Sequence, residues 1–525
     1  MDGLGQAGEL RSPAFFMAGF GMIKFCRISS VLVLALVLRA MFTSAPAGAK
    51  PVMVHYMPWF ESEPYSGYWG WHWTMNYFNP SVTNTIGNGQ IASWYYPLPG
   101  PYDSADPAVL EYHVLLMKLA GVDGIIVDWY GTDNFNDYAL INQRTVDLFN
   151  YARKAGLKFC LCYEDSTIQQ EVNGGFITAA NAVSHAQQTM LYVQTNYFAD
   201  PDYLRLNSMP VLLNFGPQYF TANASWVSIF SVLNATNQPA FFTEDNRLPV
   251  GQGAFDWPPM WMSQTNGGVL NDFMMQSYLS SFEQKALASP AWPAFISTAF
   301  PRFHDIYQQA GVGASYGYLD DQNGNTLRET LSRAMTNASA IVQVATWNDF
   351  GEGTIVEPMV NGASGCGLVD TNNTTTLYGY SDLGIIQDFR RLYLDASFPY
   401  HTNDLSLALR LFNLREFYAS SNPVVSAELD RVFSNIVSGN LTVANLQLVG
   451  VETNVPVIYN LSLEDKQLQF FIGGFLSTNG IQIETSSNLL TWQTIINQTV
   501  DTNQATFNTL VLPTASPVFF RIQNN

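Results

Sequence analysis

The 24 residues from Asp106 to Trp129, DPAVLEYHVLLMKLAGVDGIIVDW, predict a helix followed by a buried strand. Asp106 is suited to cap the helix, and Pro107 suits its first position. Apolar residues then recur at helical spacing until Gly121, which is expected to end the helix. The run Gly124–Trp129 is apolar almost throughout, as in parallel strands that are buried on both faces. This segment therefore predicts one unit of an α/β fold.

Similar apolar runs recur between residues 50 and 395. The eight candidate strands are Val52–Tyr56, Gly124–Trp129, Leu157–Tyr163, Pro210–Asn214, Ala240–Thr243, Pro259–Met262, Ala294–Ala299 and Ile341–Thr346. A second helix is expected to be capped by Asn325 and to bury Leu331, Met335 and Ala338. Eight strands with intervening helices over roughly 350 residues predict a (β/α)8 TIM barrel with insertions. A doubly wound open sheet is the main alternative, but no G-x-G-x-x-G follows any expected strand.

Two further regions follow the expected barrel. Residues 396–452 look mainly helical, with Leu407, Leu411 and Leu414 in one run, and we expect a connector. Residues 453–525 predict a small all-β sandwich with an accessory role, either in sugar binding or in attachment. Its expected strands are Gln467–Ile472, Gly480–Thr485, Leu490–Ile496, Ala505–Leu512 and Val518–Ile522.

The composition restricts the class of partner. The chain has 525 residues, of which 47% are hydrophobic and 12% charged, so it can bury a large core. Its net charge of −19 argues against binding to nucleic acid or anionic lipid and is compatible with a neutral polysaccharide. Aromatic residues make up 14%, which fits either a large core or a cleft that stacks on sugar rings. We expect a monomer.

The N-terminal residues predict export. Met22–Arg27 carries positive charge, Val31–Leu38 is an unbroken apolar run, and Ala47–Ala49 suits a cleavage site. Because Arg39 interrupts the apolar stretch, a membrane helix of ~20 residues is not expected. We therefore expect residues 1–49 to be a signal peptide, with Met22 as an alternative start, and the mature chain to be secreted or periplasmic.

Cysteine and histidine spacing predicts no metal site. Cys160, Cys162 and Cys366 lack the spacing of metal ligands, and we expect buried structural thiols. Cys160 and Cys162 alternate along one expected strand, so both should face the same side. No H-E-x-x-H or Gly-rich phosphate loop appears, so we expect no metal and no cofactor.

Polar and aromatic residues gather at the carboxyl ends of the expected strands. In barrels these ends and the loops after them carry the functional groups. We expect the side chains to converge on one mouth rich in carboxylates and aromatic rings, which suits glycoside hydrolysis. The strand-end candidates are His55, Tyr56, Trp59, Asp128, Trp129, Tyr163, Glu164, Asn214, Glu244, Trp261, Asn348, Asp349 and Glu352. Each also has a structural alternative, since Asp after a strand often caps the next helix and Trp is often buried.

Three motifs resemble a known group of enzymes. These are VHYMPWF at residues 54–60, GWHW at residues 70–73 and WNDFGEGTIVEP at residues 347–358. They are similar to glycoside hydrolase families 71 and 99 over roughly residues 50–395. WNDFGE resembles the family 71 α-1,3-glucanases, and EGTIVEP resembles the family 99 endo-α-mannosidases. The resemblance adds His72, Trp73 and Glu357 as candidate substrate-binding residues and implies no metal.

The resemblance also implies catalytic roles. Asp349 and Glu352 match the two catalytic carboxylates, with Glu352 as the general acid. In family 71 the partner is an Asp that activates water, with inversion. In family 99 it is a Glu that assists attack by the sugar's own 2-hydroxyl, with retention. Asp349 is one methylene shorter than Glu, which widens the gap between the carboxyls and favours inversion, where ~6.5–9.5 Å is needed to hold a water.

Three functions remain open at this stage. The first is an endo-acting hydrolase of α-linked polysaccharide, either α-glucan or α-mannan. The second is a sugar-binding barrel without turnover, against which the presence of both Asp349 and Glu352 argues. The third is a surface or structural protein whose C-terminal module carries the function.

Overall fold

The computed structural model describes residues 50–83, 88–362, 364–368, 378–418, 422–464, 467–474, 481–486, 490–498, 506–511 and 519–524. The expected signal peptide, residues 1–49, lies outside this part of the chain.

Eight parallel strands form a closed barrel. They are β1 (Val52–Tyr56), β2 (Gly124–Trp129), β3 (Lys158–Tyr163), β5 (Met209–Asn214), β6 (Ala240–Glu244), β7 (Gly253–Phe255), β8 (Ile296–Ala299) and β11 (Ile341–Val344). The strand order is β3, β2, β1, β11, β8, β7, β6, β5, and β5 pairs back to β3. This closure confirms the predicted (β/α)8 barrel and excludes the open sheet. A short strand β4 (Arg205–Leu206) adds to β5 in antiparallel orientation.

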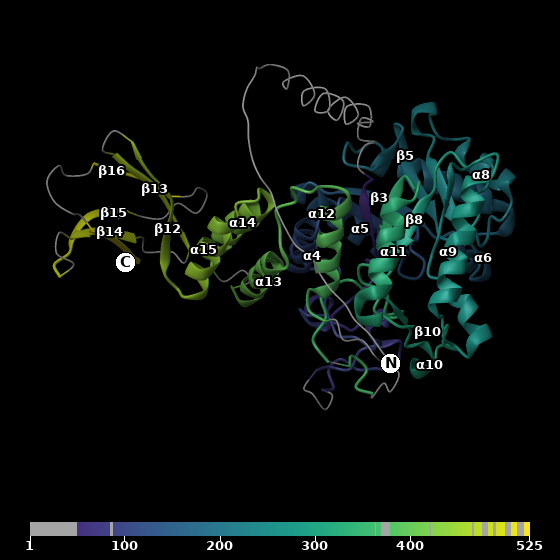
Figure 1. Ribbon diagram of the computed structural model, residues 1–525, viewed down its shortest axis with the longest axis horizontal. Helices are drawn as coiled ribbons and strands as arrows, with labels where there is room; N and C mark the ends of the chain where they lie inside the picture. Colours follow the sequence, from purple (N-terminus) through teal and green to yellow (C-terminus); the bar gives the residue numbers. More distant parts are fainter. Residues whose placement is uncertain are drawn as a thin grey trace, which may run out of the picture. The chain divides into compact units, whose positions relative to one another are not determined.

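Helices fill the connections between most of these strands. The longer ones are α4 (Pro107–Ala120), α5 (Tyr138–Ala155), α6 (Ser166–Asn173), α7 (Ala182–Val193), α8 (Asn223–Phe230), α9 (Asp272–Leu287), α11 (Asn325–Thr336) and α12 (Ser381–Tyr393). In Figure 1, α5 and α11 lie alongside the strands, and they contact β2 and β8 respectively. The apolar faces of these helices therefore cover the outer face of the barrel.

Shorter helices and strands lie in the loops that connect the barrel elements. The short α-helices are α2 (Glu63–Ser66), α3 (Trp71–Thr74) and α10 (Tyr307–Ala310), and the short antiparallel pair is β9 (Phe303–His304) and β10 (Tyr318–Leu319). Short segments of 3-10 or π-helix are η1 (Ala179–Asn181), η2 (Gln194–Phe198), η3 (Ala235–Asn237), η4 (Met260–Asn266), η5 (Gln322–Gly324) and η6 (Thr402–Leu405).

The residues expected to begin and end α4 do so in the structure, whereas α11 is capped one residue earlier than expected. The Asp106 carboxylate accepts a hydrogen bond from the Ala108 amide at 2.8 Å, and Gly121 ends α4 with φ +82°. At α11 the capping position is Gly324 rather than Asn325, whose amide instead donates to Glu329. Asn325 is therefore the first residue of the helix and not its cap.

The expected sixth strand, Pro259–Met262, is wrong. These residues lead into the 3-10 helix η4, and the sixth strand is β7, only three residues long. No helix separates β6 from β7 within this fully described stretch, so the expected strand–helix rhythm fails here. A Gly-Ala-Phe strand also lacks the β-branched residues that normally mark strands.

The chain after the barrel is helical and then all-β. The helices are α13 (Ser406–Tyr418), α14 (Pro423–Val437) and α15 (Leu441–Glu452). The strands are β12 (Pro456–Glu464), β13 (Gln467–Gly474), β14 (Ile481–Ser486), β15 (Gln493–Gln498), β16 (Thr506–Val511) and β17 (Phe519–Asn524). They form two three-stranded antiparallel sheets, which confirms an all-β region. The strand β12 was not among the expected strands, and it begins with Pro456, a residue that strands tolerate at their first position.

Among the described residues, no helix combines the length and the apolar character needed to cross a bilayer.

Asp165 fixes the loop after β5 to the end of β3. The Asp165 side chain is fully buried and accepts hydrogen bonds from the backbone amides of Gln218, Tyr219 and Phe220 at 2.8, 2.8 and 2.7 Å. One carboxylate therefore satisfies three amide groups that would otherwise be unpaired. This loop begins directly after a strand end, so Asp165 helps to shape the mouth of the barrel.

Replacing Asp165 with Ala should lower the free energy of unfolding by roughly 3 kcal/mol, because three backbone amides lose their acceptor at once. The matched control is Asp202→Ala, which removes an exposed ion pair to Lys158 and should cost less than about 1 kcal/mol. Urea denaturation followed by circular dichroism measures both. Equal losses in the two variants would show that Asp165 has no special role.

Candidate active site

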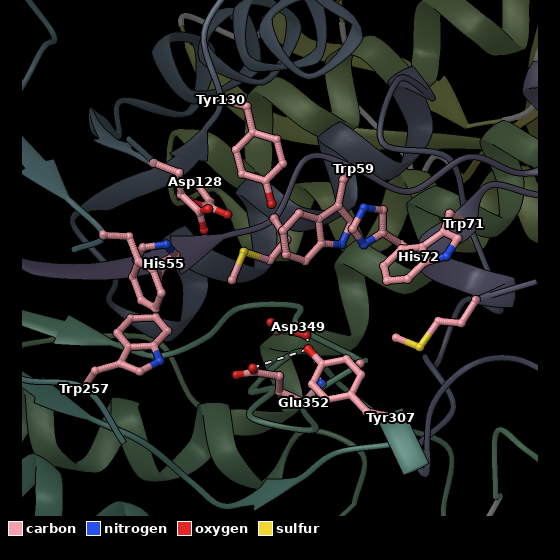
Figure 2. Close-up of a pocket in the computed structure, with 15 residues that line it drawn as sticks. His55, Trp59, Trp71, His72, Asp128, Tyr130, Trp257, Tyr307, Asp349 and Glu352 are labelled. Carbon is pink, nitrogen blue, oxygen red and sulfur yellow. Dashed lines mark hydrogen bonds between the residues drawn. The ribbon is translucent and has the colours of Figure 1, made fainter. Parts of the chain in front are cut away.

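A cavity of about 220 Å³ opens at the carboxyl ends of the barrel strands. Residues after seven of the eight barrel strands contribute to it, as expected for a barrel. Figure 2 shows Asp349 and Glu352 on one side of this cavity, with Asp128, Tyr130 and Trp59 across from them. The lining residues are His55, Met57, Trp59, Trp71, His72, Met75, Asp128, Tyr130, Glu164, Phe215, Trp257, Tyr307, Asp349, Gly351 and Glu352.

Alternation along the strand ends decides which side chains reach the cavity. Successive side chains of a strand point to opposite faces. Asp128 and Tyr130 line the cavity, whereas Trp129 between them is fully buried and donates from its indole nitrogen to Asn142 on α5 at 3.1 Å. Residues of one parity therefore serve the cavity, and residues of the other parity hold the surrounding helices.

The loop after β11 is tied to the end of β1. The Asn348 side chain accepts from the Met57 amide at 2.8 Å and donates to the Met57 carbonyl at 3.0 Å. It also donates to the Tyr102 hydroxyl at 3.1 Å. We call this set of three hydrogen bonds the Asn348 clamp. It sets the position of the next residue, Asp349, whose own amide donates to the Thr346 hydroxyl at 2.8 Å.

The environments of Asp349 and Glu352 differ. Burial raises the pKa of Asp349 to about 6, and backbone amides of Gly351 and Glu352 that donate to its carboxylate limit this rise. Burial and then the nearby charge of Asp349 raise the pKa of Glu352 well above its ordinary value. The Tyr307 hydroxyl, 3.3 Å from a Glu352 carboxylate oxygen, opposes that rise only in part. Of the two carboxyls, Glu352 therefore has the stronger tendency to hold a proton, and Asp349 the stronger tendency to be ionised.

Two more carboxylates face the same cavity. Burial and the charge of Glu164 raise the pKa of Asp128 well above its ordinary value, and burial raises the pKa of Glu164 to about 7. Among the described residues that line the cavity, none is Lys or Arg. Side chains of His55, Asp128 and Cys162 also offer one ligand atom each within 4.8 Å of one another. The cavity is thus strongly acidic and lined by potential hydrogen-bond partners for hydroxyl groups.

Aromatic rings form the walls of the cavity. The rings of Trp59 and His72 stack with their centroids 4.2 Å apart and an angle of 8° between their planes. Trp257 packs edge-on against His55 at 4.9 Å, and Trp71 stands 42% exposed at the rim. Faces of this kind suit the apolar faces of sugar rings.

Comparisons with known proteins agree with this arrangement. The model of glycosyl hydrolase family 99 matches residues 49–235. The glycoprotein endo-alpha-1,2-mannosidase of Mus musculus is 22% identical over 333 residues, which span 58% of this chain and 67% of that protein. The chain is a family 71/99-like glycoside hydrolase.

Two other similar proteins extend the comparison. The glycoprotein endo-alpha-1,2-mannosidase-like protein of Danio rerio is 20% identical over 336 residues, 59% of this glycoside hydrolase and 71% of that protein. The solved structure of the family 99 endo-alpha-mannosidase from Bacteroides thetaiotaomicron is 19% identical, with a TM-score of 0.49 over 66% of this chain and 98% of that one.

The structure brings together seven of the predicted site residues in this glycoside hydrolase. They line the cavity, and they are His55, Trp59, His72, Asp128, Glu164, Asp349 and Glu352. Of these, His72 also lies 3.8 Å from Asp137, a contact that orients its ring beneath Trp59.

Seven other predicted residues lie behind the cavity wall and are buried. Tyr56 hydrogen-bonds to His113 on α4 at 2.9 Å, and Trp73 packs on Phe60. Asn214 donates to the Tyr163 carbonyl at 2.7 Å. The strand alternation described above explains this for the four residues that end strands, and all seven side chains support the wall rather than line it. The full set is Tyr56, Trp73, Trp129, Tyr163, Asn214, Asn348 and Glu357.

Glu357 and Asn348 act together through Tyr102. The Glu357 carboxylate accepts from the Tyr102 hydroxyl at 2.8 Å and lies 3.2 Å from His113. The Tyr102 hydroxyl is also the acceptor in the Asn348 clamp. Glu357 therefore braces the loop that carries Asp349.

The last two predicted residues, Trp261 and Glu244, also lie outside the cavity lining. Trp261 was expected at a strand end, but it lies on the 3-10 helix η4 and is 66% exposed. Glu244 ends β6, where burial raises its pKa to about 7 and the charge of Glu164 adds to the rise. Glu244 therefore belongs to the acidic surroundings of the cavity without lining it.

The list of predicted site residues omitted several side chains that line the cavity. Phe215 follows the named strand-end residue Asn214, so the alternation of a strand could have identified it. Trp257 follows β7, the strand that was misplaced. Trp71 lies in the GWHW motif but was not chosen from it, and no sequence signal identifies Met75 or Tyr307, because an irregular loop and the short helix α10 orient them.

Replacing Asn348 with Ala should lower the free energy of unfolding by roughly 2–3 kcal/mol, because the Met57 amide and carbonyl lose buried partners. It should also reduce kcat on any cleaved glycoside at temperatures where the variant is fully folded, because Asp349 shifts. Urea denaturation and steady-state kinetics measure the two effects. The control is Asn196→Ala at an exposed position, which should leave both unchanged. Full activity in folded Asn348→Ala would contradict the positioning role.

Proposed function

We propose that this glycoside hydrolase cleaves α-linked mannose-containing glycans within the chain. Glu352 would act as general acid and Asp349 as general base, with inversion of configuration. The assignment of these roles rests on the different surroundings of the two neighbouring carboxyls, which favour the charged form of Asp349 and the neutral form of Glu352. The Asp349 carboxylate accepts backbone amide hydrogen bonds that stabilise its ionised form, whereas Glu352 lies beside that negative charge and stays protonated.

The chemistry follows from these protonation states. Glu352 donates its proton to the glycosidic oxygen as the bond from that oxygen to the anomeric carbon breaks. Asp349 removes a proton from a water whose oxygen forms the new bond to the anomeric carbon. The transition state carries positive charge on the sugar ring, which the acidic cavity stabilises. Glu352 then regains a proton from solvent.

The substrate class rests on the relatives and on the aromatic walls. The mouse relative is an endo-alpha-1,2-mannosidase, which favours α-mannosides over α-glucans. The Trp59–His72 stack and the exposed Trp71 offer faces for sugar rings on one side of the carboxylates. An α-glucan remains the second candidate, since WNDFGE resembles the family 71 glucanases.

Retention is the alternative stereochemical outcome. In that case Asp349 would remove the proton of the sugar's 2-hydroxyl, whose oxygen would attack the anomeric carbon, and water would then open the resulting ring. The shorter side chain of Asp349 favours the water-activating role. NMR observation of the first anomer released from an α-glycan separates the two. The inverted anomer supports our proposal, and the retained anomer contradicts it.

Asp349→Asn and Glu352→Gln should each lower kcat/KM on α-mannans by about 10²–10⁴-fold, since each removes a proton-transfer group. The two variants should differ on a glycosyl fluoride, whose leaving group needs no proton. Glu352→Gln should regain activity on that substrate, and Asp349→Asn should not. The matched control is Asp388→Asn on α12, whose side chain is 75% exposed and which should behave like the parent.

Two results would contradict this assignment. One is full activity of either variant on the natural glycan. The other is a parent enzyme that cleaves no member of a broad panel of α-mannans and α-glucans while binding them, which would support a binding protein instead.

The pH profile of kcat/KM should be bell-shaped. Activity should fall as the pH drops through about 6, because Asp349 becomes protonated and cannot act as a base. It should also fall at higher pH as Glu352 loses its proton. Tyr307→Phe should move the alkaline limb to higher pH and leave the acid limb in place, because the Tyr307 hydroxyl lowers the pKa of Glu352. In the control Tyr316→Phe both limbs should stay. A downward shift in Tyr307→Phe would reverse our acid assignment.

A further inference from the structure

Three neighbouring strands bring a histidine, a carboxylate and a thiol together at the base of the cavity. His55, Asp128 and Cys162 lie on β1, β2 and β3, and Asp128 and Cys162 are direct partners in the strand register. Each offers a ligand atom within 4.8 Å of the other two. All three are buried, with 1%, 3% and 0% of their surface exposed.

Two atoms of this group have unused hydrogen-bonding capacity. His55 Nδ1 and Asp128 Oδ1 are buried, and neither has a hydrogen-bond partner in the described part of the chain. Buried polar atoms are nearly always paired, so unpaired atoms on two neighbouring side chains that can both bind a metal leave capacity for a ligand. Figure 2 shows the His55 ring and the Asp128 carboxylate close to each other at the edge of the cavity.

We propose that His55, Asp128 and Cys162 form a binding site for a thiophilic divalent cation, Zn²⁺ or Cd²⁺, and that the bound ion inhibits the enzyme. Imidazole, carboxylate and thiolate are the three protein ligands that zinc uses. A sulfur ligand favours these ions over Mg²⁺ and Ca²⁺, which prefer oxygen alone.

The spacing of the three side chains fits a tetrahedral ion. Bonds of ~2.3 Å to sulfur and ~2.0 Å to nitrogen and oxygen place tetrahedral ligand atoms about 3.5 Å apart, so each side chain needs to move by less than about 1 Å. As the sulfur–metal bond forms, the Cys162 thiol proton leaves to solvent. Three protein ligands leave the fourth position for a water.

The cavity gives an ion access and a favourable field. His55 and Asp128 line it directly, whereas Cys162 lies behind them. The carboxyl groups of Glu164 and Asp349 line the same cavity and add acidic side chains beside the three proposed ligands. A cation therefore accumulates in this cavity before it meets the three ligands.

Inhibition follows from the place of the ion. It would compete with the sugar for His55 and Asp128, and it would oppose the positive charge that develops on the sugar ring. This consequence rests on the proposed function, because it needs the cavity to be the catalytic one. The binding itself does not depend on that proposal.

A second group of potential ligands lies outside the cavity and must be separated from this one. Asp133, Glu171 and His185 also offer ligand atoms within 4.8 Å of one another. His185 lies 2.9 Å from Asp133 and 3.4 Å from Glu171, so this group already forms ion pairs. It contains no thiol, which allows spectroscopy to tell the two groups apart.

The test titrates Cd²⁺ and Zn²⁺ into the full-length reduced protein. We expect a thiolate-to-metal charge-transfer band in the ultraviolet with Cd²⁺ and one tight site by calorimetry. Cys162→Ala should abolish the band and weaken binding by about 10-fold or more. The matched control is Cys160→Ala, a buried thiol two residues away on the same strand, which should keep both signals. His185→Ala should also keep the band.

A second variant guards against misfolding. Cys162→Ser should match the parent in thermal unfolding without metal and should still lack the band. Zn²⁺ should inhibit glycan hydrolysis by the parent and Cys160→Ala, and about 10-fold more Zn²⁺ should be needed for Cys162→Ala.

The outcomes separate the two proposals. A Cd²⁺ band or tight site that survives in folded Cys162→Ala, or that disappears in Cys160→Ala or His185→Ala, overturns the metal site. A parent that binds Cd²⁺ through Cys162 but hydrolyses no α-glycan supports the metal site and contradicts the proposed function. Zn²⁺ bound through Cys162 without inhibition of an active parent overturns the inhibitory role.

Discussion

The Asn348 side chain hydrogen-bonds to both the amide and the carbonyl of Met57, and so joins the loop after the last barrel strand to the end of the first. Closing a barrel brings these two chain segments together, but the pairing of the strands does not fix the position of the loop after β11 relative to the loop after β1. The Asn348 clamp does so, with Tyr102 and Glu357 bracing it from behind. Since Asp349 and Glu352 follow directly, the position of both proposed catalytic carboxylates depends on this contact.

Given that position, electrostatics separates the roles of the two carboxylates. Four acidic side chains share one cavity whose described lining holds no Lys or Arg. Backbone amides stabilise the charge of Asp349. Burial and the nearby charge of Asp349 both disfavour the ionised form of Glu352. In the proposed mechanism Glu352 thus holds the proton that a leaving oxygen needs, and Asp349 carries the negative charge that activates a water. No cationic side chain is needed in this scheme, because the substrate is neutral until its transition state.

Much of the barrel could be predicted from the sequence, because continuous apolar runs such as Val52–Tyr56 and Gly124–Trp129 appear as strands with those bounds. β7 escaped prediction, because three residues carry too little pattern. The misplaced strand also explains why Trp261 was chosen and Trp257 was missed. Strand ends could be found from the sequence. Which side chain at each strand end faces the cavity was predicted correctly only in part. Tyr307 depends on a short helix in a long loop, and its orientation is a property of tertiary packing alone.

Cavity-facing and helix-facing side chains alternate at the strand ends, so the sugar pocket and the barrel framework are encoded at separate, interleaved positions. A lineage can exchange Tyr130 or Phe215 and acquire affinity for a different glycan while Trp129 and Asn214 keep the surrounding elements in place. Selection for a new substrate and selection for a stable fold then act on different codons only one residue apart. Cavity residues can therefore be substituted one at a time while each variant keeps the contacts that stabilise the fold.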